Sequence, residues 1–360
     1  MNDKISPRNE GKSNPVTIKT IANELGISFS TVSKALNNSS LVKEETRQIV
    51  WAKAKELGYS PNMLARGLRG KETKMIAAII NDTVNSVISY MLNAITCEMN
   101  KYGYTLMVCD PQFDEKTEQN IIMSILSKQP DFVIFSPATS NPENLKLFSG
   151  LEDKLIVMGR RIPGFDCNCV DVDYEAGGYM SASAVLSQGH REVLVLMEPL
   201  EFPLSGQFIS GVERAFREYG LVFDRSRIRH TQTTVESGFQ ALNSLWNEEQ
   251  QRYEPDFTAI ISFCDIVAHG AYKSLYMHKK RIPEDVSVIG FDDNPLNEFS
   301  MPPLTAIRLP GENIAQNCVN ILKSKLLTKS PAIYCDSITP TLSWRKSVGP
   351  APDKKIDSYD

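Results

Sequence analysis

Residues 17–38, TIKTIANELGISFSTVSKALNN, decide the fold at the start of the chain. Thr17 is a good N-cap, and the apolar residues of IKTIANEL recur at helical spacing after it. Gly26 then marks a tight turn, and Ser28 can cap a second short helix. The second helix is expected to bury Val32, Ala35 and Leu36 on one face.

A third helix is predicted over 41–59, LVKEETRQIVWAKAKELGY, with Gly58 as its stop signal. Two short helices joined by a glycine turn, followed by a supporting helix, are typical of a helix-turn-helix DNA reader. We therefore expect an all-α DNA-binding domain over 16–61. The residues available to its core from the third helix are Ile49, Val50, Ala52, Ala54 and Leu57.

The charge of the chain is unevenly distributed. Residues 16–74 contain ten Lys and Arg against five Asp and Glu, a net charge of +5, and residues 1–15 contribute +1. The total of −4 therefore leaves −10 for residues 75–360. A small basic segment on a large acidic body indicates a nucleic-acid-binding module, although a solvated charged surface has the same composition.

The ends of the chain and its cysteines narrow the class of protein. No apolar run reaches the length of a membrane span, and the polar residues 1–15 form no signal peptide, so we expect a disordered leader and a cytoplasmic protein without membrane contact. Seven scattered cysteines, an odd count, argue against a disulfide framework and indicate buried or incidental thiols. Cys167-x-Cys169 is only a weak metal signal.

From Met75 onward, short apolar runs alternate with helical segments. Runs such as MIAAII and DFVIFS are typical of strands buried on both faces. A second series begins after CVDVDYEAGG, with EVLVLM, FTAIISF and VSVIGF. Two blocks of such units predict an α/β core with two parallel-sheet subdomains. Ligands bind at the carboxyl ends of parallel strands, so a cleft between the two sheets is the expected site.

Sequence motifs of common enzymes are absent. The chain contains no GxxxxGK[ST], no GxGxxG after a strand, no HExxH and no GxSxG, and its four histidines have no ligand spacing. We therefore expect no enzyme, no catalytic residues, no metal and no cofactor.

TVSKALN, EETR, ELGYSPN and ARGLR occur in order within residues 16–70, and GGYMSASAVLSQGHREV, RIPEDVSVIGFDD and PPLTAIRLP follow in the body. On these motifs the chain resembles the lactose repressor/galactose repressor family of bacterial regulators over roughly 16–347. The resemblance implies a dimeric transcription factor with a periplasmic-binding-protein-like core, whose ligand tunes its affinity for double-stranded DNA.

The resemblance makes the second helix the recognition helix, which enters the major groove. Phe29, Ser30 and Lys34 then stand at base-reading positions, and Lys34 can donate to guanine O6 and N7. Phe29 either packs against a thymine methyl or a sugar, or folds back into the core. Contacts with phosphates are implied for Ser28, Thr31, Asn37 and Tyr59.

Residues 62–73 correspond to the hinge helix and linker of the family. Leu68 matches the hinge leucine, which wedges into the minor groove at the operator centre, and Ala65 and Arg69 are further expected DNA contacts. The predicted helix is short and contains Gly67, so we expect it to order only on DNA.

The resemblance also implies which residues form the effector site, position by position. Asp292 matches the anchor for a polar group of the ligand; Asp265 either shares that role or caps the following helix. Arg160 either meets an anionic or hydroxylated ligand or forms a surface ion pair. Apolar residues stand at several positions that are polar or aromatic in relatives, which argues against a typical pyranose or purine effector. The remaining expected lining residues are Val87, Ile88, Phe202, Phe208 and Thr233.

The resulting prediction is a homodimeric regulator, most simply a repressor, of a pseudo-palindromic operator with a carbohydrate-like effector. The rivals are a regulator of the same fold that responds to a partner protein or to no effector, and a ligand-binding protein without DNA function. The polar tail, 349–360, lacks the apolar heptads of a tetramerising coiled coil. The expected core, 74–348, has a first subdomain of about 74–172 and 304–333 and a second of about 173–303 and 334–348.

Overall fold

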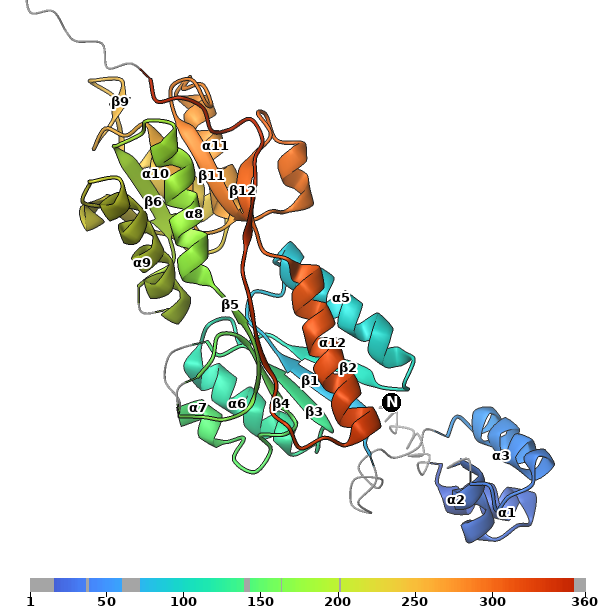
Figure 1. Ribbon diagram of the computed structural model, residues 1–360. Coiled ribbons are helices and arrows are strands. Elements are labelled where there is room, and N and C mark those ends of the chain that lie inside the picture. Colours follow the sequence, from blue (N-terminus) through green and yellow to red (C-terminus); the bar gives the residue numbers. More distant parts are fainter. Residues whose placement is uncertain are drawn as a thin grey trace, which may run out of the picture. The chain divides into compact units, whose positions relative to one another are not determined.

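A computed structural model divides the chain into two compact units, Met1–Lys71 and Glu72–Asp360 (Figure 1). The structure describes residues 16–36, 39–59, 72–138, 143–162, 164–200 and 202–352.

The first unit contains three helices around a small apolar core. Thr17 caps the first helix through a capping box with Thr20, and Gly26 ends it in the left-handed conformation, at φ 63°. Val32, Ala35 and Val50 are fully buried between the helices. The helices are α1 (Ile18–Leu25), α2 (Phe29–Leu36) and α3 (Glu44–Glu56).

The third helix begins later and buries fewer residues than its sequence predicts. Val50 and Ala54 are buried and Leu57 packs against them, at a spacing of four and then three residues. Ile49 is 57% exposed and Ala52 is also exposed, so the expectation that they belong to the core is wrong. Both lie off the stripe defined by the other three, because successive helical residues are about 100° apart.

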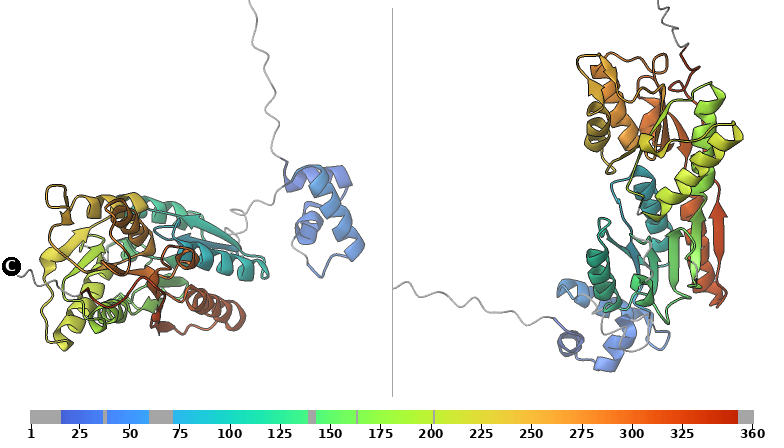
Figure 2. Two further views of the ribbon diagram at one scale, coloured as in Figure 1. Left: turned by 90° about the horizontal axis from the view of Figure 1, so that it is seen from above. Right: turned by 90° about the vertical axis from the view of Figure 1, so that its left-hand side faces the viewer.

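The first lobe of the second unit is a six-stranded parallel sheet covered on both faces. Helices lie on both faces of the sheet (Figures 1 and 2). Alternate residues of β1 point to opposite faces: Ile76 and Ala78 pack with α5 and α12, whereas Ala77 and Ile79 pack with α6 and α7. The strand order is β13-β5-β4-β3-β1-β2. The strands are β1 (Met75–Ile79), β2 (Thr105–Cys109), β3 (Phe132–Phe135), β4 (Leu155–Gly159), β5 (Asn168–Val172) and β13 (Cys335–Ile338); the helices are α5 (Ser86–Asn100), α6 (Glu115–Leu126), α7 (Glu143–Lys146) and α12 (Gly311–Thr328).

The second lobe repeats this architecture in the order β14-β12-β11-β10-β6-β7, with only β14 antiparallel to its neighbour. Helices α8 and α9 cover one face, and α10 and α11 cover the other. The strands are β6 (Val193–Met197), β7 (Ile228–His230), β10 (Ala259–Ser262), β11 (Ser287–Asp292), β12 (Thr305–Arg308) and β14 (Thr341–Ser343), and a small hairpin consists of β8 (Trp246–Asn247) and β9 (Arg252–Tyr253). The helices are α8 (Tyr174–Ser187), α9 (Pro203–Glu218), α10 (Val235–Asn243) and α11 (Asp265–Met277), with short 3₁₀ turns at Arg225–Arg227 and Pro295–Glu298.

Helices α8 and α9 approach each other closely because glycine lies at their contact. A Cβ atom added at Gly178 would lie 2.0 Å from the carbonyl oxygen of Phe208, and one at Gly211 would lie 1.9 Å from that of Glu175. Neither position accepts a side chain without moving a helix. This contact fixes the start of α9, which reaches the cleft between the lobes.

The chain crosses between the lobes after β5, after β12 and after β13. The expected boundaries at 304 and 334 are therefore wrong. Residues 305–308 form β12, which pairs with β11 in the second sheet, and residues 335–338 form β13, which pairs with β5 in the first. The pairing partner of a strand is a long-range property, and an apolar run alone does not specify it.

The cysteine prediction also needs one correction. Cys169 on β5 and Cys335 on β13 are register partners, with Cα atoms 4.4 Å apart, and they form a disulfide. The other five cysteines are free, and burial raises the pKa of the Cys167 thiol to about 11. Within the residues that the structure describes, no helix has the length and apolar character needed to cross a membrane.

Candidate functional site

Helix α2 presents an exposed polar face with an aromatic residue at its start. The Ser28 hydroxyl accepts a hydrogen bond from the Thr31 backbone N–H at 3.0 Å, which caps the helix as expected. Phe29 is 44% exposed and lies outside the apolar core of the unit. The alternative in which this ring folds back into the core therefore does not hold. Ser30 and Lys34 are exposed beside it.

Lys34 is the basic residue of α2, whereas two basic residues of α3 have acidic neighbours. Arg47 pairs with Glu44 at 2.9 Å and Lys53 pairs with Glu56 at 2.8 Å. Lys34 thus supplies the positive charge on the exposed face of α2.

The remaining expected DNA contacts divide into two groups. Tyr59 is partly buried against the core of the helical unit. The others lie outside the described residues, as does most of the expected hinge. They are Asn37, Ala65, Leu68 and Arg69.

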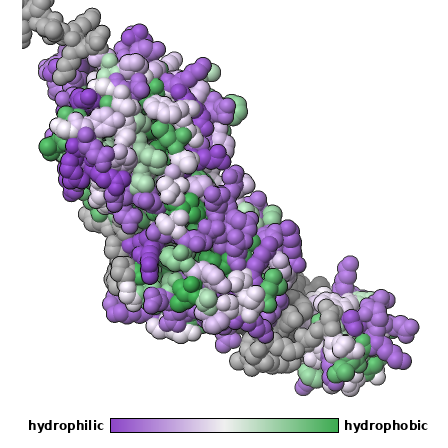
Figure 3. Space-filling view, in the orientation of Figure 1, coloured by the Kyte–Doolittle hydropathy of each residue, from purple (hydrophilic) through white to green (hydrophobic). Residues whose placement is uncertain are grey.

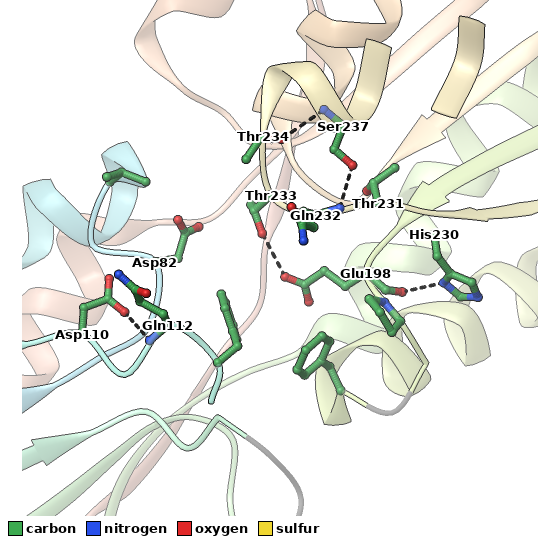
Figure 4. A pocket seen from close by; sticks show the side chains of 14 residues that line it. Asp82, Asp110, Gln112, Glu198, His230, Thr231, Gln232, Thr233, Thr234 and Ser237 are labelled. Carbon is green, nitrogen blue, oxygen red and sulfur yellow. Dashed lines mark hydrogen bonds between the residues drawn. The ribbon is translucent and has the colours of Figure 1, made fainter. Parts of the chain in front are cut away.

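A cleft separates the carboxyl ends of the strands of the two lobes (Figure 4). Asp82 and Asp110 enter it from the first lobe, Asp82 shortly after β1 and Asp110 directly after β2. Glu198 and Thr233 enter it from the second lobe, and the Thr233 hydroxyl donates a hydrogen bond to the Glu198 carboxylate at 3.3 Å. Both parallel sheets therefore contribute to one site, as the strand-end rule predicts.

An inner cavity of about 140 Å³ continues this cleft and contains Asp292 in its wall. Asp292 ends β11, and its carboxylate accepts a hydrogen bond at 3.1 Å from the Asn85 side chain of the first lobe. Val87 and Ile88 follow Asn85 on α5 and provide part of the apolar wall. The two lobes thus meet through a polar contact inside the cavity.

Burial disfavours the ionised form of the acids in the cleft. Burial, followed by the negative charge of Asp265, raises the pKa of Asp292 well above its ordinary value. Burial raises the pKa of Glu198 to about 7, and the charge of Asp82 adds to this effect. Burial likewise raises the pKa of Asp82. Carboxylates of this kind are typical of binding and active sites.

Most of the expected effector residues line the cleft. Thr233 lines both its outer part and the inner cavity, and Phe202 lines the outer part and a small side hollow. Arg160, 8% exposed, lies in the wall of that side hollow, and its pKa is lowered by burial although the charge of Glu118 opposes the shift.

Phe208 and Asp265 lie behind these walls. Phe208 is fully buried and packs edge-on against Phe263 and Phe291. Asp265 accepts hydrogen bonds from the Asn294 backbone at 2.6 Å and from the Asn297 side chain at 2.8 Å. It therefore holds the loop that follows Asp292.

Glu198, Asp82, Asn81 and Asp110 belong to the cleft but are not in the predicted site. Each lies at or near the end of a strand: Asp110 directly follows β2, Glu198 directly follows β6, and Asn81 and Asp82 come shortly after β1. The strand-end rule also fits Asp292, which was taken from the family resemblance, and it applies equally to these strands. Applied to every apolar run, it would have found all four residues from the sequence.

A helical unit with an exposed polar recognition face and a two-lobed core with a cleft define a ligand-responsive DNA-binding regulator. Residues 17–62 match the family model described as bacterial regulatory proteins of the lacI family, and residues 182–348 match that of a periplasmic binding protein-like domain. The chain is 30% identical over 336 residues to the HTH-type transcriptional repressor PurR of Actinobacillus pleuropneumoniae serotype 3 (strain JL03), covering 92% of this chain and 98% of that protein. The chain belongs to the LacI family of bacterial transcriptional regulators.

Solved structures show the same fold at lower sequence identity. The lac repressor dimer bound to operator and the anti-inducer ONPF has a TM-score of 0.77 and 22% identity, covering 93% of this chain and 100% of that one. The complex of the transcriptional regulator CelR with cellobiose has a TM-score of 0.68 and 21% identity, covering 92% and 99%.

Proposed function

We propose that this protein is a transcriptional repressor that acts in the cytoplasm and binds a pseudo-palindromic operator as a homodimer, with an affinity set by a small molecule in the cleft. One observation carries the proposal: the chain that exposes Phe29, Ser30 and Lys34 on α2 also holds a cavity that both lobes of its core line. A repressor named PurR and a lac repressor bound to its operator are similar to it.

On DNA, α2 lies in the major groove in this proposal. Lys34 donates to a guanine, and Phe29 contacts a thymine methyl or a sugar. Ser30 reads a base edge, and Ser28 and Thr31 contact phosphates. Further contacts are proposed for Asn37 and Tyr59, and in the minor groove for Ala65, Leu68 and Arg69.

The effector binds between the lobes and changes their relative angle. Asn85 and Asp292 support this coupling, because their hydrogen bond joins the lobes inside the cavity that the effector would enter. A ligand that replaces or strengthens this contact favours one arrangement of the lobes, and operator affinity follows. The CelR–cellobiose complex supports a carbohydrate-like effector as the starting hypothesis.

Exposed apolar side chains on the second lobe support self-association. Tyr276 is 84% exposed, Met277 54% and Met301 91%, and all three border one surface hollow. On the face shown in Figure 3, the surface is mainly hydrophilic, with small separate hydrophobic patches. A second copy that covers Tyr276 and Met301 would remove this apolar surface from water.

The main rival is a regulator of the same fold without a small-molecule effector. The acidic residues inside the cavity, Asp292 and Glu198 above all, favour an effector, because burying a carboxylate whose hydrogen-bond partner is neutral is costly and a ligand can relieve that cost. We also infer that the protein is not an enzyme, because its family consists of transcriptional regulators.

The test of this function is selection of duplexes from a random library by the full-length protein. We expect a pseudo-palindromic consensus, with binding that weakens steeply as salt concentration rises. Binding without any sequence preference would contradict the proposal.

A further inference from the structure

Three hollows of the cleft meet at Glu198. The outer part has a volume of about 640 Å³, the inner cavity about 140 Å³ and the side hollow about 50 Å³. Glu198 and Phe113 line all three. Any small molecule that occupies the centre of the cleft therefore meets the Glu198 carboxylate.

Acidic side chains outnumber basic ones in the walls of this cleft, and Arg160 lines only the side hollow. Asp82, Glu198 and Asp292 line the inner cavity, and they come from the ends of three different strands in two lobes. The described walls of that cavity include no Lys, Arg or His side chain. In the outer part the basic residue is His230, whose Nδ1 lies 3.1 Å from the backbone oxygen of Glu198 and not at its carboxylate.

These carboxylates are poorly compensated by the protein itself. Among the residues that the structure describes, the Glu198 carboxylate accepts a hydrogen bond from one hydroxyl, that of Thr233, at 3.3 Å. The side-chain contact of Asp292 is one neutral amide, that of Asn85 at 3.1 Å. Partly desolvated carboxylates with neutral partners remain costly in the ionised form, and a positive group placed among them relieves that cost.

An organic cation suits the remaining wall of the inner cavity. The described residues contain no group of three or more His, Cys, Asp or Glu side chains that could hold a metal ion. The rest of the inner wall is apolar and aromatic, with Tyr174 stacked against Phe291 at 5.7 Å and against Phe263 at 6.1 Å. A compact hydrocarbon or ring body suits this wall, and an aromatic surface also attracts cations.

We propose that Glu198 is the specificity-determining residue of the effector cleft and that the effector it selects is a small organic amine, protonated at neutral pH, on a compact ring body. Amino sugars and alicyclic amines belong to this class, whereas neutral sugars and organic acids do not. This inference rests on the proposed function, because it concerns the ligand of the same cleft. Asp82 and Asp292 share the positive charge with Glu198.

Calorimetry on the full-length protein tests this inference with matched pairs of probes. Glucosamine is compared with glucose, and cyclohexylamine with cyclohexanol; glucuronate represents the acids. Charged hydrogen bonds of this kind are worth about tenfold or more in affinity, so at least one amine is expected to bind about tenfold more tightly than its neutral partner. Equal binding within both pairs, tighter binding of glucuronate, or no binding of either amine would overturn the inference.

Two variants test whether the Glu198 carboxylate causes the preference for amines. Glu198→Gln keeps the size of the side chain and an oxygen for Thr233, so the amine preference is expected to fall to near unity. Glu284→Gln removes an exposed acid of the same lobe and is expected to leave the preference unchanged. An undiminished preference in Glu198→Gln would contradict the role of this residue. Operator binding by the ligand-free wild-type protein is measured in parallel. Its absence counts against the proposed function, whereas the absence of an amine preference in wild type alone counts only against this inference.

Discussion

The variant Lys34→Ala tests whether a single residue of α2 reads a base of the operator. Lys34 is exposed on α2, and in the proposed complex it donates to a guanine. Lys34→Ala is expected to cost about 1–3 kcal/mol of operator binding and to relax the preference at one symmetric base pair of each half-site. Fluorescence anisotropy with the selected duplex and its single-base variants measures both effects. A loss that is equal for all sequences would instead make Lys34 a phosphate contact.

The raised pKa of Glu198 predicts that the stability of the folded protein depends on pH. The pKa of this carboxylate is raised from an ordinary 4.5 to about 7, so between these values the folded protein binds more protons than the unfolded chain. Its contribution to stability is therefore present below pH 4.5 and is lost as the pH rises through about 7. In Glu198→Gln this loss disappears.

The melting temperature of Glu198→Gln relative to wild type is thus expected to increase as the pH rises from about 5.5 to about 8. The comparison with wild type is essential, because the lowered pKa values of the buried His190 and His269 act on stability in the opposite direction. Glu284→Gln serves as the control and is expected to show a difference that does not change with pH. A constant difference for Glu198→Gln would show that the carboxylate has an ordinary pKa.

Among the secondary-structure elements, the contact between α8 and α9 gives a matched pair of glycine substitutions. A methyl group at Gly178 meets the Phe208 backbone at 2.0 Å, so Gly178→Ala is expected to destabilise the protein by about 1–3 kcal/mol. Gly206 lies on α9 with nothing within 4 Å of its added Cβ, and Gly206→Ala is expected to stabilise the helix by up to about 1 kcal/mol. Urea unfolding measures both. Equal effects of the two substitutions would contradict the close packing.

Local sequence patterns predicted the helices and strands well, because helix caps and apolar runs depend on neighbouring residues. The capping of α1 and α2 follows from Thr17 and Ser28, and the apolar runs became strands within one or two residues of their expected ends. The assignment of β12 and β13 to the two sheets was wrong, because it depends on the strands with which they pair. The partner of β13 is more than a hundred residues away in the sequence.

Some of the residues that line the cleft were also predictable, because their positions depend on local sequence, whereas the positions of others depend on long-range packing. Asp292, Val87 and Thr233 were expected and line the cleft, whereas the burial of Phe208 behind Phe291 depends on the approach of α8 and α9. Glu198 needed no long-range information. It was overlooked because the expected site residues were taken from the family resemblance and not from the ends of the strands.

The exposed apolar side chains of the second lobe predict that the protein forms a dimer. The full-length protein is expected to sediment as a dimer at micromolar concentration, and Tyr276→Asp is expected to shift it toward the monomer. Val222, 93% exposed elsewhere on that lobe, provides the control: Val222→Asp is expected to leave the dimer intact. A stable tetramer, or a Tyr276→Asp dimer as strong as wild type, would contradict this arrangement.

The function of the whole molecule depends on control of α2 by a small molecule in the cleft. Operator affinity is measured by anisotropy for wild type and Asp292→Ala, each with and without the compound that gives the largest thermal shift in wild type. We predict that the compound changes operator affinity about 5–150-fold in wild type and leaves it unchanged in Asp292→Ala. An unaltered response in Asp292→Ala would contradict control through the cleft.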